Sequence, residues 1–193
     1  WKGVIGEDGI NNIEMSLGTK NGKFFHEVQS MALSLSQKGV IIGLCSKNNS
    51  DDVDEVLMTH DDMVLNESSI TIKKVNWLDK VTNLQEISKE LNIGLDSFVF
   101  IDDSLFETNL IKELLPEVTV LEVPTKIYNY PKLFRKNLGL FYNLSQTYED
   151  SQKAQIYQEQ KQREVEKLEF SSLDNYLASL GLELVIHRND KTL

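Results

Sequence analysis

Short apolar runs alternate with amphipathic segments along the first 123 residues of the chain. The apolar runs have the length of strands, and turn-forming or polar residues bound them. They predict buried strands at residues 40–45, 98–102 and 118–123, with a shorter one at residues 63–65. The amphipathic segments predict helices at residues 23–37, 79–91 and 105–115, and a short helix that begins near Asp51. Because helices that alternate with strands are the crossovers of parallel sheets, the pattern predicts an α/β fold with a doubly wound, parallel sheet.

The two ends of the chain carry different patterns. Near the start, Val4-Ile5 and Ile13-Glu14-Met15 flank Gly6-Glu7-Asp8-Gly9, which predicts a β-hairpin whose glycines supply positive φ angles. After residue 126 the chain becomes more polar. A helical linker is predicted over residues 127–170, with a long solvated helix at 147–169, and a helix and a strand follow within residues 171–193.

Composition restricts the classes of function. A chain of 193 residues has room for one α/β domain of about 140 residues and an extension. The net charge of −10 argues against binding to nucleic acid or to a membrane surface, and no apolar run approaches the length of a membrane-spanning helix. The single cysteine, Cys45, fits the reducing cytoplasm, and because it closes an apolar strand we expect a buried structural thiol.

The clearest chemical signal is the adjacent acid pair Asp102-Asp103, which follows the apolar run that begins at Phe98. In open α/β sheets, ligands bind beyond the carboxyl ends of the strands. Two carboxylates there repel each other unless a cation neutralises them, so the pair predicts a Mg²⁺ site. The alternative is that one aspartate only caps the helix that starts at Ser104 and the other is solvated.

Further polar residues follow the other predicted strand ends. Ser46, Lys47 and Asn48 come directly after the 40–45 run, and Lys80 lies at the start of a helix. Ser46 would donate a hydrogen bond to a phosphate oxygen, and Lys80 would pair with the phosphate as a compact positive charge. The alternatives are that Ser46 only caps a turn, that Lys80 is an ordinary exposed lysine, and that Lys47 and Asn48 merely shape the loop.

Four motifs together resemble the FkbH-like branch of the haloacid dehalogenase (HAD) superfamily. They are Gly3-Val4-Ile5-Gly6-Glu7-Asp8-Gly9, Cys45-Ser46-Lys47-Asn48, Asn76-Trp77 with Lys80, and Val99-Phe100-Ile101-Asp102-Asp103. The resemblance runs through nearly the whole chain. It implies a HAD-type Rossmann-like sheet with a flap hairpin over the site, and a C-terminal extension that leads into a second domain similar to GNAT acyltransferases. The expected domains are residues 1–126, a linker at 127–170, and the start of the second domain at 171–193.

The resemblance also implies roles for individual residues. Asp102 and Asp103 would bind Mg²⁺, with Asp103 as a second ligand or as an orienting acid, and Ser46, Lys47, Asn48 and Lys80 would bind phosphate. Lys80, Ser46 and Asp103 would take part in catalysis. The family usually has asparagine where this chain has Ser104, and arginine where it has Thr108, so the details of the substrate site are expected to differ.

The first motif of the family, a strand that ends in Asp-x-Asp-x-Thr, does not occur in the 193 residues. In the family it supplies the nucleophile and the general acid/base, and its strand lies between the strands that correspond to 40–45 and 98–102. A sheet without that strand would leave buried backbone groups unpaired, at a cost of roughly 1–3 kcal/mol each. We therefore expect the natural protein to continue upstream of Trp1, and the fragment alone to be inactive.

Three functions are compatible with these residues. Members of the FkbH-like branch are associated with loading a glyceryl unit from a phosphorylated glycolytic metabolite onto an acyl carrier protein, which predicts a phosphorylated small molecule and a carrier protein as partners. A generic Mg²⁺-dependent phosphatase would use the same residues but release phosphate to water. The third interpretation is a non-catalytic scaffold that binds a carrier-protein partner. We expect Trp77 to be a core anchor, and the alternative is a binding platform for a ligand.

Overall fold

The computed structural model describes residue 1, residues 9–141, residues 156–157 and residue 159. The chain divides into two compact units, residues 1–154 and residues 155–193. The elements below all belong to the first unit. The predicted helix at 147–169, apart from three of its residues, and the predicted start of a second domain at 171–193 lie outside the described residues.

Four strands form two parallel pairs. β1 (Gly43–Ser46) pairs with β2 (Ile72–Val75), and β3 (Val99–Asp102) pairs with β4 (Thr119–Glu122). Within the described part of the chain, β1 and β3 do not pair with each other. In the two registers Ser46 lies opposite Val75, and Asp102 lies opposite Glu122, so that the carboxyl ends of each pair are level. The predicted parallel α/β arrangement is confirmed.

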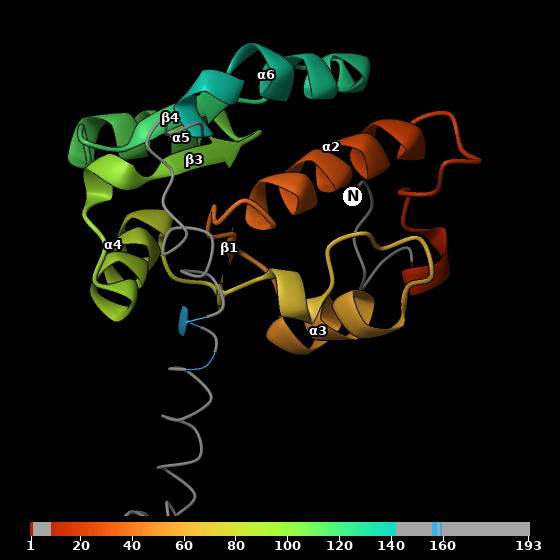
Figure 1. Ribbon diagram of the computed structural model, residues 1–193, viewed down its shortest axis with the longest axis horizontal. Coiled ribbons are helices and arrows are strands. Elements are labelled where there is room, and N and C mark those ends of the chain that lie inside the picture. The colour runs from red at the N-terminus through yellow and green to blue at the C-terminus, as the bar shows by residue number, and fades with distance from the viewer. Residues whose placement is uncertain (2–8, 142–155, 158, 160–193) are drawn as a thin grey trace, which may run out of the picture. The chain divides into compact units, whose positions relative to one another are not determined.

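Helices connect and cover the strands (Figure 1). The α-helices are α2 (Gly22–Ser36), α3 (Ser50–Thr59), α4 (Lys80–Leu91), α5 (Leu105–Leu114) and α6 (Tyr130–Lys136). The short 3-10 helices are η1 (Ile10–Asn12), η2 (Glu67–Ser69), η3 (Leu95–Ser97), η4 (Ile127–Asn129) and η5 (Leu138–Phe141). α4 contacts β1, β2 and α5, whereas α5 contacts β3 and β4. α6, which lies within the predicted linker, contacts α2, and the rings of Phe25 and Tyr130 meet edge to face there.

Two helix caps position the start of α4 and of α5. Asp79 accepts a hydrogen bond from the backbone N–H of Thr82 at 2.8 Å, and Ser104 accepts one from the backbone N–H of Glu107 at 3.3 Å. Such caps satisfy N–H groups that the first helical turn leaves unpaired. Both helices begin a few residues after a strand ends, α4 after β2 and α5 after β3. The first residue of α4, Lys80, therefore lies near the carboxyl edge of the strands.

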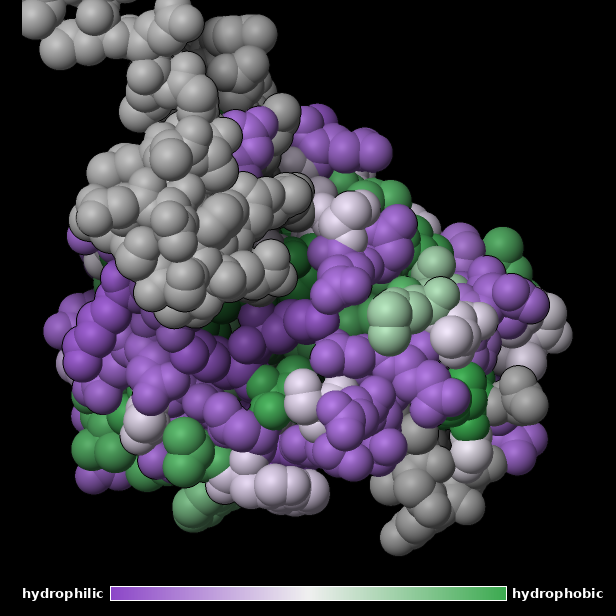
Figure 2. All heavy atoms as spheres, turned by 90° about the horizontal axis from the view of Figure 1, so that it is seen from below, coloured by the Kyte–Doolittle hydropathy of each residue, from purple (hydrophilic) through white to green (hydrophobic). Residues whose placement is uncertain are grey.

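The apolar faces of the helices form the core. One cluster joins the N-terminal segment to α3 and contains Ile13, Met15, Val53, Val56, Leu57 and Ile70. The buried apolar residues of α4, β3 and α5 include Val81, Leu84, Ile87, Leu91, Phe100 and Ile111. On the face shown in Figure 2, the described residues that are visible are mostly hydrophilic, with small apolar areas between them. No described helix combines the length and the apolar character needed to cross a membrane.

The prediction of a strand at residues 63–65 is wrong. The side chain of Gln29, which is buried on α2, accepts hydrogen bonds from the backbone N–H groups of Val64 and Leu65 at 2.9 and 3.1 Å. Those donors are therefore used by a side chain instead of a neighbouring strand. The true second strand is β2, which sequence reasoning missed because Lys73 and Lys74 interrupt its apolar pattern.

The two lysines of β2 are neutralised by acids on neighbouring elements. Lys73 pairs with Asp54 and Glu67 at 2.7 and 2.9 Å. Lys74 pairs with Glu86 at 3.0 Å and also with Glu90. The predicted N-terminal hairpin is only partly within the described residues: Ile10–Asn12 form the 3-10 helix η1, and residues 2–8 lie outside.

Candidate functional site

A buried ion pair lies at the carboxyl edge of the strands. Lys80, the first residue of α4, donates a hydrogen bond through Nζ to Oδ2 of Asp102, the last residue of β3. Their side chains are only 11% and 7% exposed. The structure thus brings together two of the predicted site residues, which are 22 positions apart in the sequence. The predicted alternative in which Lys80 is an exposed surface lysine is wrong.

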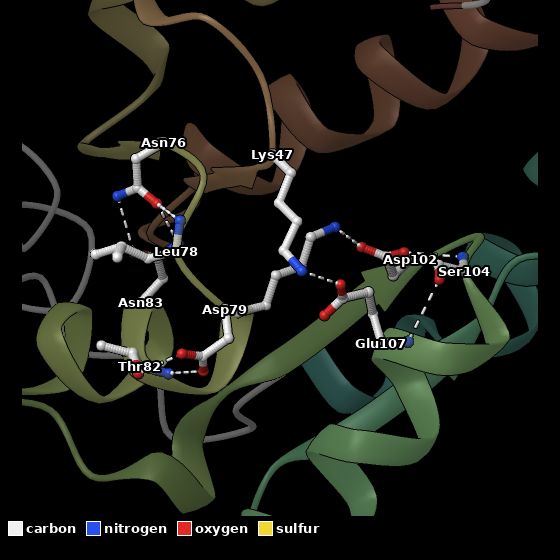
Figure 3. Close-up of polar contacts among 10 residues, drawn as sticks. Lys47, Asn76, Leu78, Asp79, Thr82, Asn83, Asp102, Ser104 and Glu107 are labelled. Atoms are coloured by element: carbon white, nitrogen blue, oxygen red, sulfur yellow. Dashed lines mark hydrogen bonds and ion pairs between the residues drawn. The ribbon is translucent and has the colours of Figure 1, made fainter.

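The two adjacent aspartates have different surroundings. Oδ1 of Asp102 accepts a hydrogen bond from the backbone N–H of Ser104 at 2.9 Å, and this contact turns the chain from β3 into α5 (Figure 3). Asp103 is exposed and makes no hydrogen bond or ion pair with other described residues. Its charge acts on Tyr130, whose pKa is raised by burial and, to a smaller extent, by Asp103. The predicted roles of Asp103 in metal binding and catalysis stay predictions.

A second lysine–carboxylate pair, Lys47 with Glu107, lies in the same group of side chains as Asp102 (Figure 3). Nζ of Lys47 donates to Oε1 of Glu107 at 2.6 Å, and this hydrogen bond raises the pKa of the lysine. The Glu107 side chain is 7% exposed, and its other oxygen, Oε2, is buried with no hydrogen-bond partner in the part of the chain that the structure describes. The sequence analysis assigned Glu107 no role. Its only signal was its place in the first turn of α5.

The remaining predicted phosphate ligands differ in what holds them. Oδ1 of Asn48 accepts a hydrogen bond from the backbone N–H of Asn49 at 2.8 Å, so Asn48 does shape its loop. The backbone oxygen of Ser46 accepts from Asn76, whereas its hydroxyl has no hydrogen bond to any described residue. Contacts of Ser46, Lys47, Asn48 and Lys80 with phosphate stay predictions.

An amide pair that sequence reasoning missed holds the loop before α4. Asn76 and Asn83 exchange two side-chain hydrogen bonds, each 3.0 Å long, and Oδ1 of Asn76 also accepts from the backbone N–H of Leu78. Asn83 is fully buried. Because the loop leads directly into Lys80, the amide pair fixes the position from which Lys80 reaches Asp102. Nothing in an isolated asparagine at either position predicts this pairing.

Asn83→Ala is expected to destabilise the domain by about 2–3 kcal/mol. The replacement leaves the amide of Asn76 without its partner, and an unsatisfied buried group costs roughly 1–3 kcal/mol. Urea unfolding should show a lower midpoint with an unchanged slope. Asn109→Ala, which removes an exposed asparagine of α5, is the matched control and should change the stability by less than about 0.5 kcal/mol. Equal effects of the two replacements would contradict a structural role for the amide pair.

The thiol of Cys45 lies close to the same groups. Burial raises its pKa to about 11. The charges of Asp102 and Glu107 raise it further, whereas Lys80 and a hydrogen bond with Asn83 lower it, and each of these effects is smaller than that of burial. The thiolate form is the nucleophile, so a raised pKa makes the thiol unreactive near neutral pH. This agrees with the predicted structural thiol.

Cys45 is expected to react with iodoacetamide at pH 8 about 100-fold more slowly in the folded protein than in urea, because its pKa is raised from 9.0 to about 11. The unfolded chain loses the thiol proton first, so the thiol also lowers the stability of the fold progressively as the pH rises from 9 toward 11. Alkylation rates measured across this pH range check the first point, and urea unfolding across the same range checks the second. A folded-state profile centred near pH 9 would contradict them.

Trp77 does not anchor the core, and that prediction is wrong. Its side chain is 75% exposed, and the next residue, Leu78, is 51% exposed. The reason is the amide pair described above: the polar side chain of Asn76 turns inward, so the loop residues that follow it face outward. Leu105 and Phe106, which follow the aspartates, are also exposed, at 65% and 70%.

The residues at this edge fit a small, hard cation that keeps part of its water shell. The described residues contain no cluster of three or more His, Cys, Asp or Glu side chains that would enclose an ion. They do offer the buried carboxylate of Asp102 and the unpartnered oxygen of Glu107. Mg²⁺ is commonly held by one or two carboxylates together with waters and substrate oxygens. Lys47 and Lys80 add two positive charges, which suit a phosphate group.

Comparisons with known proteins agree with this reading. No protein-family model matches the chain, and no curated protein matches it. Among solved structures, it is similar to the crystal structure of the N-terminal part of the protein BF1531 from Bacteroides fragilis, which contains a phosphatase domain and is complexed with Mg. The identity is 40% and the TM-score 0.72, over 75% of this chain and 38% of that one.

The chain therefore spans less than two thirds of the length of the solved chain that it matches. Together with the parallel pairing of β1 with β2 and of β3 with β4, this similarity shows that the chain has a HAD-like, Rossmann-type α/β fold.

Proposed function

We propose that this chain forms the phosphate-binding part of a Mg²⁺-dependent phosphatase with a HAD-like fold. The observation that carries the proposal is the buried pair of Lys80 and Asp102 at the carboxyl edge of the strands. Ligands of open α/β sheets bind at this edge. The similarity to a phosphatase domain complexed with Mg supports the same assignment.

The residues would divide the work as follows. Asp102 would hold Mg²⁺ through its carboxylate, whose oxygens still have lone pairs beyond those used by Lys80 and Ser104. Bound Mg²⁺ supplies a Lewis acid and offsets the charge of the phosphate. Lys80 would then share its hydrogen bonds between Asp102 and a phosphate oxygen, and the hydroxyl of Ser46 would donate to another.

The proposal is tested by phosphate release from p-nitrophenyl phosphate, using the protein at its full natural length. Treatment with EDTA should abolish the release and added Mg²⁺ should restore it. A rate that is the same with and without Mg²⁺ would contradict the proposal. A non-catalytic scaffold, the third function predicted from the sequence, would release no phosphate under either condition.

Transfer of a glyceryl unit to an acyl carrier protein is the finer version of this proposal. It rests on the sequence resemblance to the FkbH-like branch, and it uses the same site residues. Mass spectrometry of a carrier protein incubated with the full-length protein and a phosphorylated three-carbon acid separates the two. Acylated carrier supports transfer, whereas free phosphate with unmodified carrier supports the generic phosphatase.

A further inference from the structure

Glu107 is a buried carboxylate that the proposed phosphate chemistry does not yet use. It lies in the first turn of α5, where its backbone N–H is bound by the Ser104 cap. The same Ser104 donates its own backbone N–H to Asp102. Ser104 therefore connects the backbone of Glu107 to Asp102, the aspartate that would hold the metal. Figure 3 shows both carboxylates in the same group of side chains.

One oxygen of Glu107 is accounted for and the other is not. Oε1 accepts the hydrogen bond from Lys47 at 2.6 Å, whereas Oε2 is buried and has no hydrogen-bond partner among the described residues. A buried polar atom without a hydrogen bond costs roughly 1–3 kcal/mol, and such an atom in a folded protein commonly marks a bound water or ion. Since a carboxylate oxygen accepts hydrogen bonds, the missing partner must be a donor or a cation.

Ion pairing with Lys47 alone does not explain this arrangement. Lys47 is 34% exposed and could meet a carboxylate at the surface, yet its partner is 93% buried with one oxygen left over. The Glu107 carboxylate lies in the group of side chains that contains Asp102 (Figure 3), at the edge where the proposed Mg²⁺ would bind. Mg²⁺ keeps several waters when proteins bind it, and these waters are strong hydrogen-bond donors.

We propose that Glu107 is a positioning residue for the Mg²⁺ site: its free oxygen, Oε2, accepts a hydrogen bond from a water bound to the ion. This inference rests on the proposed function, because it requires Mg²⁺ at Asp102. It gives the metal site a second carboxylate on α5 that acts through water, and it assigns Lys47 the task of holding that carboxylate in place.

Glu107→Gln separates the two oxygens chemically. The glutamine amide keeps its oxygen toward Lys47 and places its NH₂ group, which donates, where Oε2 had accepted. Calorimetric titration of the full-length protein with Mg²⁺ should show affinity weaker by about 10- to 100-fold, the usual effect of removing a partner of a metal-bound ligand. Glu122→Gln is the matched control, because Glu122 is exposed, pairs with Lys112 and lies opposite Asp102 on β4.

Two further measurements exclude simpler causes of a loss. Urea unfolding establishes that Glu107→Gln remains folded. Titrations at about 0.05 M and about 0.5 M salt separate a hydrogen bond from a change in distant charge, because salt screens only the latter strongly. A difference from the unchanged protein that stays at about 10-fold or more in both salts supports the inference.

A Mg²⁺ affinity of Glu107→Gln within twofold of the unchanged protein at either salt concentration would overturn the inference while leaving the proposed function intact. Failure of the unchanged protein to bind Mg²⁺ would instead overturn the proposed function, and this inference with it.

Discussion

Asp102→Asn is expected to weaken Mg²⁺ binding by about 100-fold or more and to abolish metal-dependent phosphate release. Asp102 is the one buried aspartate at the carboxyl edge among the described residues, and its side chain is 7% exposed. Asparagine keeps the shape but removes the negative charge that Mg²⁺ requires. Calorimetric titration with Mg²⁺ measures the affinity directly. The control is Glu122→Gln, which changes the residue opposite Asp102 on β4 and should bind Mg²⁺ as tightly as the unchanged protein.

The same replacement has a second effect that must be separated from the first. It leaves Lys80 buried without its carboxylate, and breaking one side of a buried ion pair costs roughly 3–5 kcal/mol. Replacing both partners, as in Lys80→Met with Asp102→Asn, removes the stranded charge and should recover most of that stability. The double variant should be folded and still fail to bind Mg²⁺. Unchanged Mg²⁺ affinity in either variant would refute the assignment of Asp102.

Lys80→Met is expected to weaken the binding of inorganic phosphate, measured with Mg²⁺ present, by about 10- to 100-fold. Hydrogen bonds between charged groups contribute about 1.5–3 kcal/mol, and Met retains most of the volume of the lysine stem while removing the charge. Lys80 is suited to this role because its ammonium group is held at the strand edge, where only 11% of its side chain is exposed.

Lys112→Met is the control for that measurement. Lys112 also pairs with a carboxylate at a strand end, Glu122, but its side chain is 47% exposed. It lies in the last turn of α5, whereas the aspartates precede the first turn of that helix. Its replacement should leave the dissociation constant of phosphate unchanged. An equal dissociation constant for Lys80→Met and the unchanged protein would show that Lys80 serves only as the counter-ion of Asp102.

Most of the fold could be predicted from the sequence, because the segments that pack into the core also have a regular apolar pattern. The helices at α2, α4 and α5 and the strands β1, β3 and β4 fall where periodicity placed them, within a few residues. β2 was not predicted because half of its residues are lysines. These lysines are neutralised by ion pairs with acids on α3, η2 and α4. These acids lie on other elements, between 6 and 19 residues away along the chain, so the pattern within β2 itself does not reveal the strand.

The candidate site was predictable only in part, for a similar reason. A polar residue at a strand end is visible in sequence, and the pairing of Lys80 with Asp102 follows once the strands are parallel. The inward amides of Asn76 and Asn83 depend on the exact course of one loop. The outward position of Trp77 follows from the same loop, which is why an apolar side chain was misassigned to the core.

The most direct test of the account is the position of the metal in a crystal of the full-length protein grown with Mn²⁺ in place of Mg²⁺. Manganese prefers the same oxygen ligands and is located by its anomalous scattering. The account predicts one strong peak against the carboxylate of Asp102, at the carboxyl edge of β3. No peak there, or a peak only at other carboxylates, would contradict the central claim that this edge is a metal and phosphate site.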